Sequence, residues 1–218
     1  MDNKVLVVVG AGPGVGASVA RKFGREGYDV ALIARSPEPL ERLGSELQGA
    51  GITTGWTPVD ITDAEALTSA ISRFGQHLGH IDALHFNPSA FRQRDPLHLT
   101  AEELLEDLHV GVGALLTAVQ AAKPSMPSGS RVTVTGSMAA DAPSPAACSL
   151  GVQKAALRNL VLSLDRTLAP EGIRAMSLTV NGTLAPDTPF AADRVADAIY
   201  AAATTSDSDW RAEVPYNG

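Results

Sequence analysis

The sequence predicts an α/β fold, a doubly wound arrangement in which helices cover both faces of a parallel sheet. Two observations lead to this fold class. Strand-like apolar runs alternate with helical patterns along the whole chain, and parallel strands require such crossovers. No stretch resembles an interdomain linker, and α/β folds of this length are often undivided. A single domain over residues 1–218 is therefore expected.

The predicted elements follow one another in order. Short apolar runs are predicted as buried strands at 5–9, 29–34, 52–58, 83–86, 131–135 and 174–180. Helical patterns are predicted at 14–26, 38–50, 64–78, 101–122, 147–168 and 193–203. The last segment, 210–218, is expected to add an edge strand, whose length Pro215 limits because proline cannot donate to a strand ladder.

Composition and charge exclude several function classes. A net charge of −7, with no stretch rich in Lys and Arg, argues against nucleic acid as a partner. The longest aliphatic run, Val5 to Val9, is far shorter than the roughly 20 residues of a membrane span. The single cysteine, Cys148, fits a reducing compartment, and the N-terminal residues do not resemble a signal peptide. A cytoplasmic protein without membrane or metal partners is expected, since the histidines lack metal-ligand spacing.

A glycine cluster joins the first predicted strand to the first helix. Backbone N–H groups at a helix N-terminus attract anions, and residues without side chains allow a phosphate to approach closely. This arrangement is typical of Rossmann-type folds that bind a dinucleotide pyrophosphate. The alternative is a tight turn that binds no ligand, and Pro13 removes one potential donor. The residues predicted to contact the cofactor here are Gly10, Gly12, Gly14, Val15 and Gly16.

The end of the second strand indicates which dinucleotide is bound. An acidic residue there would hold the ribose 2′-hydroxyl of NAD, but the sequence from Leu32 to Ser36 contains none. Arg35 stands in that place, and a guanidinium suits a 2′-phosphate. NADP is therefore predicted in preference to NAD. The alternative is that Arg35 is an ordinary solvated surface residue.

The third strand is followed by a second group of cofactor candidates. Asp60 is predicted to accept a hydrogen bond from an adenine amino group, with Ile61 against the ring. The alternative role for Asp60 is a helix cap, which Thr62 or Asp63 would supply better.

Together these residues resemble the short-chain dehydrogenase/reductase family, over nearly the whole chain. The glycine pattern matches Gly10, Gly14 and Gly16, and the adenine-site aspartate matches Asp60. The family's Asn-Asn-Ala-Gly motif after the fourth strand is reduced here to a segment that includes Asn87 and Pro88, and the family's Pro-Gly after the sixth strand leaves Gly182. The resemblance implies that Asn87, Pro88 and Gly182 lie beside the cofactor.

The same resemblance implies the catalytic residues, but one of them is missing. In the family a serine polarises the carbonyl, a tyrosine transfers a proton, and a lysine four residues later binds the nicotinamide ribose. Ser137 and Lys154 match the serine and the lysine, whereas Leu150 occupies the tyrosine position and cannot transfer a proton. The alternatives for Ser137 and Lys154 are a turn hydroxyl and a surface lysine.

No neighbouring residue replaces that tyrosine by its spacing. Cys148 and Ser149 are turned away by one or two helical positions, and Tyr216 would have to reach the site from the C-terminus. The asparagine that the family usually carries on the helix 101–122 is also absent. His109 is a candidate replacement, because histidine titrates near neutral pH. The alternative is an exposed or capping histidine without a catalytic role.

Two functions remain open on the sequence. The first is an NADP(H)-dependent oxidoreductase acting on a carbonyl or alcohol substrate, slow or with a non-standard proton donor. The second is a catalytically silent NADP(H)-binding protein, a sensor or partner subunit. A fold without any cofactor is a third option. Segments 111–116 and 155–157 carry small residues on helices that pair with a two-fold mate in the family, so a homodimer or homotetramer is expected.

Overall fold

The computed structural model describes residues 3–218, which build a seven-stranded parallel sheet in the order β3-β2-β1-β4-β5-β6-β7. Each strand pairs in parallel with its neighbours. The strands are β1 (Lys4–Val9), β2 (Tyr28–Ala34), β3 (Thr54–Pro58), β4 (Ala83–Phe86), β5 (Arg131–Ser137), β6 (Arg174–Val180) and β7 (Glu213–Tyr216). The order reverses between β1 and β4, which opens a crevice at the carboxyl ends of these two strands.

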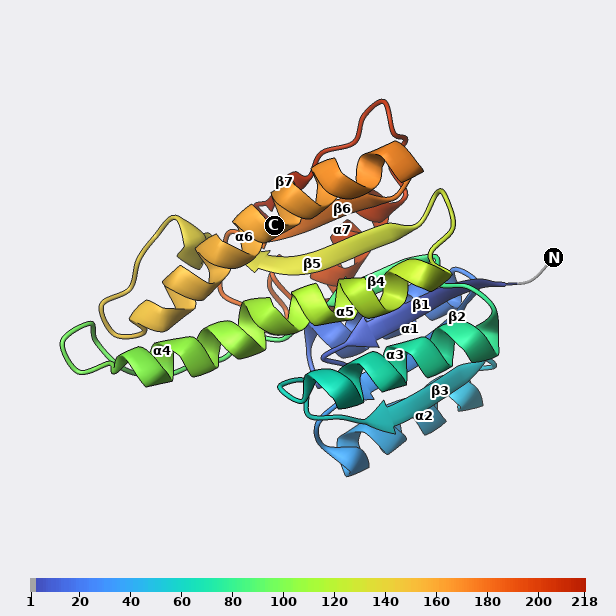
Figure 1. The fold of residues 1–218 in the computed structure, drawn as a ribbon, viewed down its shortest axis with the longest axis horizontal. Helices are drawn as coiled ribbons and strands as arrows, with labels where there is room; N and C mark the ends of the chain where they lie inside the picture. Colours follow the sequence, from blue (N-terminus) through green and yellow to red (C-terminus); the bar gives the residue numbers. More distant parts are fainter. Residues whose placement is uncertain (1–2) are drawn as a thin grey trace.

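The helices form one layer on each face of the sheet (Figure 1). The helices are α1 (Val15–Arg25), α2 (Pro37–Gly49), α3 (Ala64–Leu78), α4 (Ala101–Leu108), α5 (Ala114–Ala122), α6 (Cys148–Leu168) and α7 (Ala192–Ala203). The core on one face joins α3, α5 and α6, and the core on the other joins α1, α2 and α7. Alternate residues of β1 point to opposite faces. Val7 and Val9 belong to the core with α3, α5 and α6, and Leu6 and Val8 belong to the core with α1, α2 and α7.

The predicted helix 101–122 is helical throughout in the structure, but its middle is not α-helical. A π-helical turn from His109 to Gly113 separates α4 from α5. Glycine is a poor helix former, and the turn contains two, Gly111 and Gly113. The turn faces the N-terminal part of α6, so it lies beside the crevice. Such π-turns often mark functional sites.

The helical run Ala101–Ser125 is long and apolar enough, by length and composition alone, to cross a membrane. Its α5 part belongs to the core of the sheet, where Ala114, Leu115 and Ala118 are fully buried. Its α4 part carries acidic residues that pair with Arg92. The packing of this run is that of a core helix in a globular fold.

The C-terminal segment confirms the predicted edge strand. β7 pairs only with β6 at the end of the sheet, and Pro215 lies within it opposite Thr179. Proline is tolerated there because the outer side of an edge strand needs no donor. The other predicted strands agree with the structure except at their ends. β3 begins at Thr54 instead of residue 52, because Ile52 still closes the end of α2 through a bond to Leu47. β5 continues to Ser137 instead of ending at residue 135.

Candidate active site

A cavity of about 1090 Å³ opens at the carboxyl ends of the central strands. Its size is that of a site for a large ligand. Every predicted site residue lines it except Gly16. The predicted residues that line it are Gly10, Gly12, Gly14, Val15, Arg35, Asp60, Ile61, Asn87, Pro88, Ser137, Lys154 and Gly182.

The turn between β1 and α1 depends on three positions without side chains. Gly10 has a φ of +86°, and a Cβ there would meet the Pro88 ring at 2.9 Å. Gly14 has a φ of +102°, in the region that favours glycine. Gly16 lies directly against the Gly10 carbonyl, where a Cβ would clash with backbone. Gly16 therefore serves the close packing of helix on strand and not the cavity surface.

The N-terminus of α1 is open to an anion. Its N-cap residue, Gly14, provides no side-chain cap, and the first turn holds no acidic residue. A Cβ at Gly12 or Gly14 would meet no atom within 4 Å, so the space above the turn is free. Backbone donors, the positive end of the helix dipole and free space fit a dinucleotide pyrophosphate.

Arg35 and Asp60 lie on the rim of the same cavity, after β2 and β3. Arg35 is exposed and takes part in none of the ion pairs found among residues 3–218. Asp60 accepts bonds from the backbone and the hydroxyl of Thr62 at 3.0 and 2.7 Å, which lower its pKa. Asp63, not Asp60, caps α3. Asp60 is thus held in an ionised form beside the guanidinium, ready to accept a bond from a ligand.

A chain of hydrogen bonds connects Lys154 to the glycine turn. The Lys154 ammonium donates to the Thr135 carbonyl at 2.9 Å. The Thr135 hydroxyl donates to Asn87 Oδ1 at 2.8 Å, and Asn87 Nδ2 donates to the Gly10 carbonyl at 3.3 Å. These hydrogen bonds cross from β5 over β4 to β1, so the carboxyl ends of the three strands are fixed relative to one another.

Lys154 is buried, with 5% of its surface exposed, and burial lowers its pKa to about 8. None of the ion pairs found in the described part of the chain includes it. Nearby His85 on β4 is completely buried, and burial together with the Lys154 charge lowers its pKa to about 3. His85 is therefore neutral and bonds Thr133 through Nδ1 at 2.9 Å.

Ser137, the last residue of β5, and Leu150, on the first turn of α6, line the cavity together with Lys154. The Ser137 Oγ accepts a bond from the Ala139 backbone at 3.2 Å, which leaves its proton free to donate into the cavity. Leu150 stands one helical turn before Lys154, on the same wall.

None of the side chains considered as substitutes for tyrosine reaches the cavity lining. Cys148, Ser149 and His109 are absent from it. The possibility that Tyr216 reaches the site is wrong, because its hydroxyl donates to the Pro189 carbonyl at 2.6 Å and its ring packs on Phe190. The Phe190 ring can lie there because Gly182, in the turn after β6, has no side chain and leaves the space that the ring fills.

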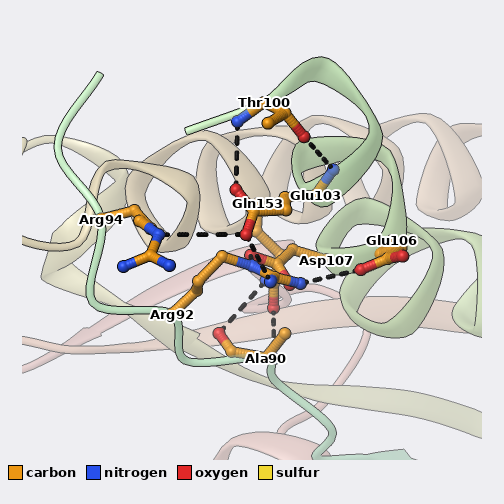
Figure 2. Close-up of polar contacts among 8 residues, drawn as sticks. All are labelled: Ala90, Arg92, Arg94, Thr100, Glu103, Glu106, Asp107 and Gln153. Atoms are coloured by element: carbon orange, nitrogen blue, oxygen red, sulfur yellow. Dashed lines mark hydrogen bonds and ion pairs between the residues drawn. The ribbon is translucent and has the colours of Figure 1, made fainter. Parts of the chain in front are cut away.

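Gln153 is a functional candidate that the sequence analysis missed. It is completely buried, and its Oε1 accepts a bond from the Ser89 hydroxyl at 3.1 Å. The same atom accepts a bond from the Ala90 backbone at 3.1 Å (Figure 2). Its carboxamide fills the space that a Cβ on Gly111 would occupy in the π-turn. Gln153 therefore joins α6, the π-turn and the segment after β4. The signal for it was Gly111, because a glycine inside a helical pattern often has a packing reason.

A cluster of charges holds the next part of that segment on α4 (Figure 2). Arg92 donates to the nearly buried Asp107, and also pairs with Glu103 at 3.1 Å and Glu106 at 2.9 Å. Glu103 in turn forms a capping box with Thr100 at the start of α4. Ala90 and Arg92 are thus fixed on either side of Phe91, whose side chain lines the cavity.

Several apolar side chains share the cavity with Ser137. Phe91, Val110, Leu150 and Leu184 line it, and Phe91 and Leu184 are exposed. Within the lining, the titratable side chains are Arg35, Asp60 and Lys154. Arg35 and Asp60 follow β2 and β3, so Lys154 is the one titratable side chain that α6 contributes to the lining.

The comparisons with known proteins identify the family. A family model described as short chain dehydrogenase matches residues 4–196. This match covers most of the chain, so the protein belongs to the short-chain dehydrogenase family. The seven-stranded α/β fold is that of its structural neighbours.

Curated relatives are distant. Oxidoreductase UcpA of Salmonella typhimurium is 29% identical over 184 residues, 82% of this chain and 68% of the relative. Dehydrogenase/reductase SDR family member 4 of Pongo abelii is 28% identical over 181 residues, 82% of this chain and 65% of the relative. The chain thus spans about two thirds of the length of these relatives.

Two solved structures illustrate the fold match. A dehydrogenase/reductase from Sinorhizobium meliloti superposes with a TM-score of 0.91 at 24% identity, over 99% of this chain and 94% of that one. A short-chain dehydrogenase from Burkholderia cenocepacia, solved in complex with NADP, superposes with a TM-score of 0.88 at 26% identity, over 99% and 96%.

A double-mutant cycle tests the contact between Gln153 and Gly111. Gly111→Ala alone is expected to lower the free energy of unfolding by about 1–3 kcal/mol, because the new methyl group overlaps the carboxamide. Gln153→Ala alone is expected to cost about 2–4 kcal/mol, from the cavity and from the unpaired donors it leaves. In the Gln153→Ala background, Gly111→Ala should cost nothing further.

Urea unfolding followed by circular dichroism measures all three variants. Gly49→Ala is the matched control, because a Cβ at Gly49 meets no neighbour, and it should leave stability unchanged or slightly higher. Additive losses in the double variant would show that the two residues do not share this space.

Proposed function

We propose that this protein is an NADP(H)-dependent oxidoreductase that interconverts a carbonyl compound and the corresponding alcohol. One observation carries the proposal: a single cavity joins the glycine turn and Arg35 to Ser137 and Lys154. The family match and the NADP bound to the Burkholderia cenocepacia neighbour support it. When bound, NADP(H) supplies or accepts a hydride at its nicotinamide ring.

The lining residues have separate roles in this proposal. Gly10, Gly12, Gly14 and Val15 hold the pyrophosphate with backbone donors, and Arg35 holds the 2′-phosphate. Asp60 and Ile61 hold the adenine. Asn87, Pro88 and Gly182 form the wall beside the nicotinamide, and Lys154 binds its ribose. Ser137 donates a hydrogen bond to the substrate oxygen and thereby polarises the carbonyl.

The substrate end of the cavity favours an apolar compound. Phe91, Val110, Leu150 and Leu184 offer hydrocarbon surface, whereas the guanidinium and the carboxylate of the lining, Arg35 and Asp60, follow β2 and β3. An aldehyde, ketone or quinone with an apolar substituent fits this surface, because a polar substituent packed on hydrocarbon would lose its hydration without a partner.

Leu150 favours a second candidate function. It deprives the site of the family's proton donor while the cofactor residues remain, as in a silent NADP(H)-binding sensor or partner subunit. The two functions predict the same cofactor binding but different turnover.

Arg35→Ala is expected to weaken NADPH binding about 10- to 100-fold and to leave NADH binding nearly unchanged, because only the 2′-phosphate loses charge-assisted bonds. Titration of the protein with each cofactor, followed by nucleotide fluorescence, measures this. Arg42→Ala is the control, since Arg42 is an exposed arginine on α2 away from the cavity. Equal losses for both cofactors would contradict 2′-phosphate recognition.

Turnover separates the two candidate functions. NADPH absorbance is followed with a panel of apolar aldehydes, ketones and quinones, for the wild type and for Lys154→Ala. The oxidoreductase predicts absorbance loss that Lys154→Ala abolishes. Tight NADPH binding without turnover would support the silent protein, and failure to bind either NADP or NAD would exclude both.

The proposal includes a homodimer or homotetramer in a cytoplasmic setting. Leu105, Leu116 and Val152 are exposed on the neighbouring helices α4, α5 and α6, whereas the small-residue positions Gly111 and Ala114 are buried within the chain. Leu105→Glu/Leu116→Glu is therefore expected to reduce the molar mass in light scattering to that of a monomer. Thr68→Glu, on the exposed side of α3, is the control, and a monomeric wild type would contradict the oligomer.

A further inference from the structure

Leu150 leaves the site without a phenol, and the described residues offer one replacement. Of the titratable side chains in the cavity lining, Arg35 and Asp60 follow β2 and β3, whereas Lys154 donates to Thr135 on β5. Three strand spacings of about 4.8 Å, roughly 14 Å, separate β2 from β5. Arg35 and Asp60 therefore cannot serve a carbonyl held by Ser137, and Lys154 can.

We propose that Lys154 Nζ is itself the proton donor to the substrate oxygen during carbonyl reduction. This inference rests on the proposed function and assigns its missing acid. The carbonyl carbon gains the hydride that NADPH provides, which leaves NADP⁺, and the electron pair of the broken C=O π bond goes to oxygen. That oxygen takes one proton from Nζ, and the neutral amine then regains a proton from water.

The surroundings of Lys154 favour the release of a proton. Its one hydrogen bond, to the Thr135 carbonyl at 2.9 Å, uses one of three N–H groups. Burial removes water from the ammonium, and its pKa falls to about 8. A donor with a pKa near the operating pH is the most effective, because it is protonated and yet acidic.

The charged groups on the elements that pack against α6 do not compete for this proton. His85 stays neutral because burial lowers its pKa to about 3. His109 lies exposed on the π-turn. Most of the remaining charges are paired with one another, and Glu102 and Arg166 are exposed. The pairs are Arg158 with Asp141 and Glu213, Arg92 with Asp107, Glu103 and Glu106, Arg174 with Asp165, Arg131 with Asp207, and Lys123 with Glu171.

The kinetic test compares the wild type with Lys154→Arg and Lys154→Met at saturating NADPH, so that weaker ribose binding does not lower the rate. The wild-type kcat for carbonyl reduction should fall tenfold per pH unit above about pH 8, as Nζ loses its proton. Lys154→Arg keeps the charge but not the acidity, since arginine stays protonated. Its kcat should fall about 10²–10⁴-fold and lose this pH dependence.

A second readout does not depend on turnover. The chain has only four lysines, Lys4, Lys22, Lys123 and Lys154, so the side-chain amines of ¹⁵N-lysine-labelled protein give four resolvable NMR titrations. One signal should titrate near pH 8 and be missing from Lys154→Arg. Lys154→Met should melt no lower than the wild type, because it removes an unpaired buried charge.

The outcomes separate this inference from the proposed function. NADPH binding and wild-type turnover with an unchanged kcat and pH profile in Lys154→Arg would overturn the role of Lys154 alone. A Lys154 amine that titrates with the surface lysines would overturn it as well. NADPH binding without wild-type turnover would overturn it in favour of the silent protein, and absence of NADPH binding would overturn the function itself.

Discussion

The site depends on the close approach of backbone segments where β1 turns into α1. Gly10 and Ala11 both donate their N–H groups to the Ile33 carbonyl at the end of β2, while Pro88 from the end of β4 presses on Gly10 from the other side. Gly16 then brings α1 against the Gly10 carbonyl. A Cβ at Gly10 would meet Pro88 after β4, and a Cβ at Gly16 would meet the Gly10 carbonyl after β1. The open N-terminus of α1, and hence the anion site, exists because this contact is made by backbone alone.

This contact also determines where the substrate end lies. The hydrogen bonds from Gly10 through Asn87 and Thr135 to Lys154 run across β1, β4 and β5, so α6 is held at a fixed distance from the glycine turn. Gln153 adds a second connection one residue earlier on α6, to the segment after β4. Adjacent residues of one helix therefore position the cofactor wall and the mouth of the cavity. A shift of α6 would disturb both.

Most of the fold could be predicted from the sequence, because buried parallel strands and amphipathic helices leave strong periodic patterns. The residues that line the cavity were predictable for a related reason: they follow strands, and parallel strand ends meet at one edge of the sheet. The π-turn at His109–Gly113 was not predictable, since its pattern merges with the helices on either side. Gln153 was missed because its role depends on a space above Gly111 that only the packing of two distant helices creates. The position of Tyr216 likewise depends on tertiary contacts, with Pro189 and Phe190.

Leu150 removes a hydroxyl that could transfer a proton, and its hydrocarbon side chain lines the cavity one helical turn before Lys154. A tyrosine there would offer its hydroxyl to the ammonium and stabilise the charge. Leucine offers no acceptor. In the structure the ammonium donates to the Thr135 carbonyl, and burial lowers its pKa to about 8. The site therefore lacks the family's phenol, but it keeps a buried ammonium on the same cavity wall, and this group has a proton to donate.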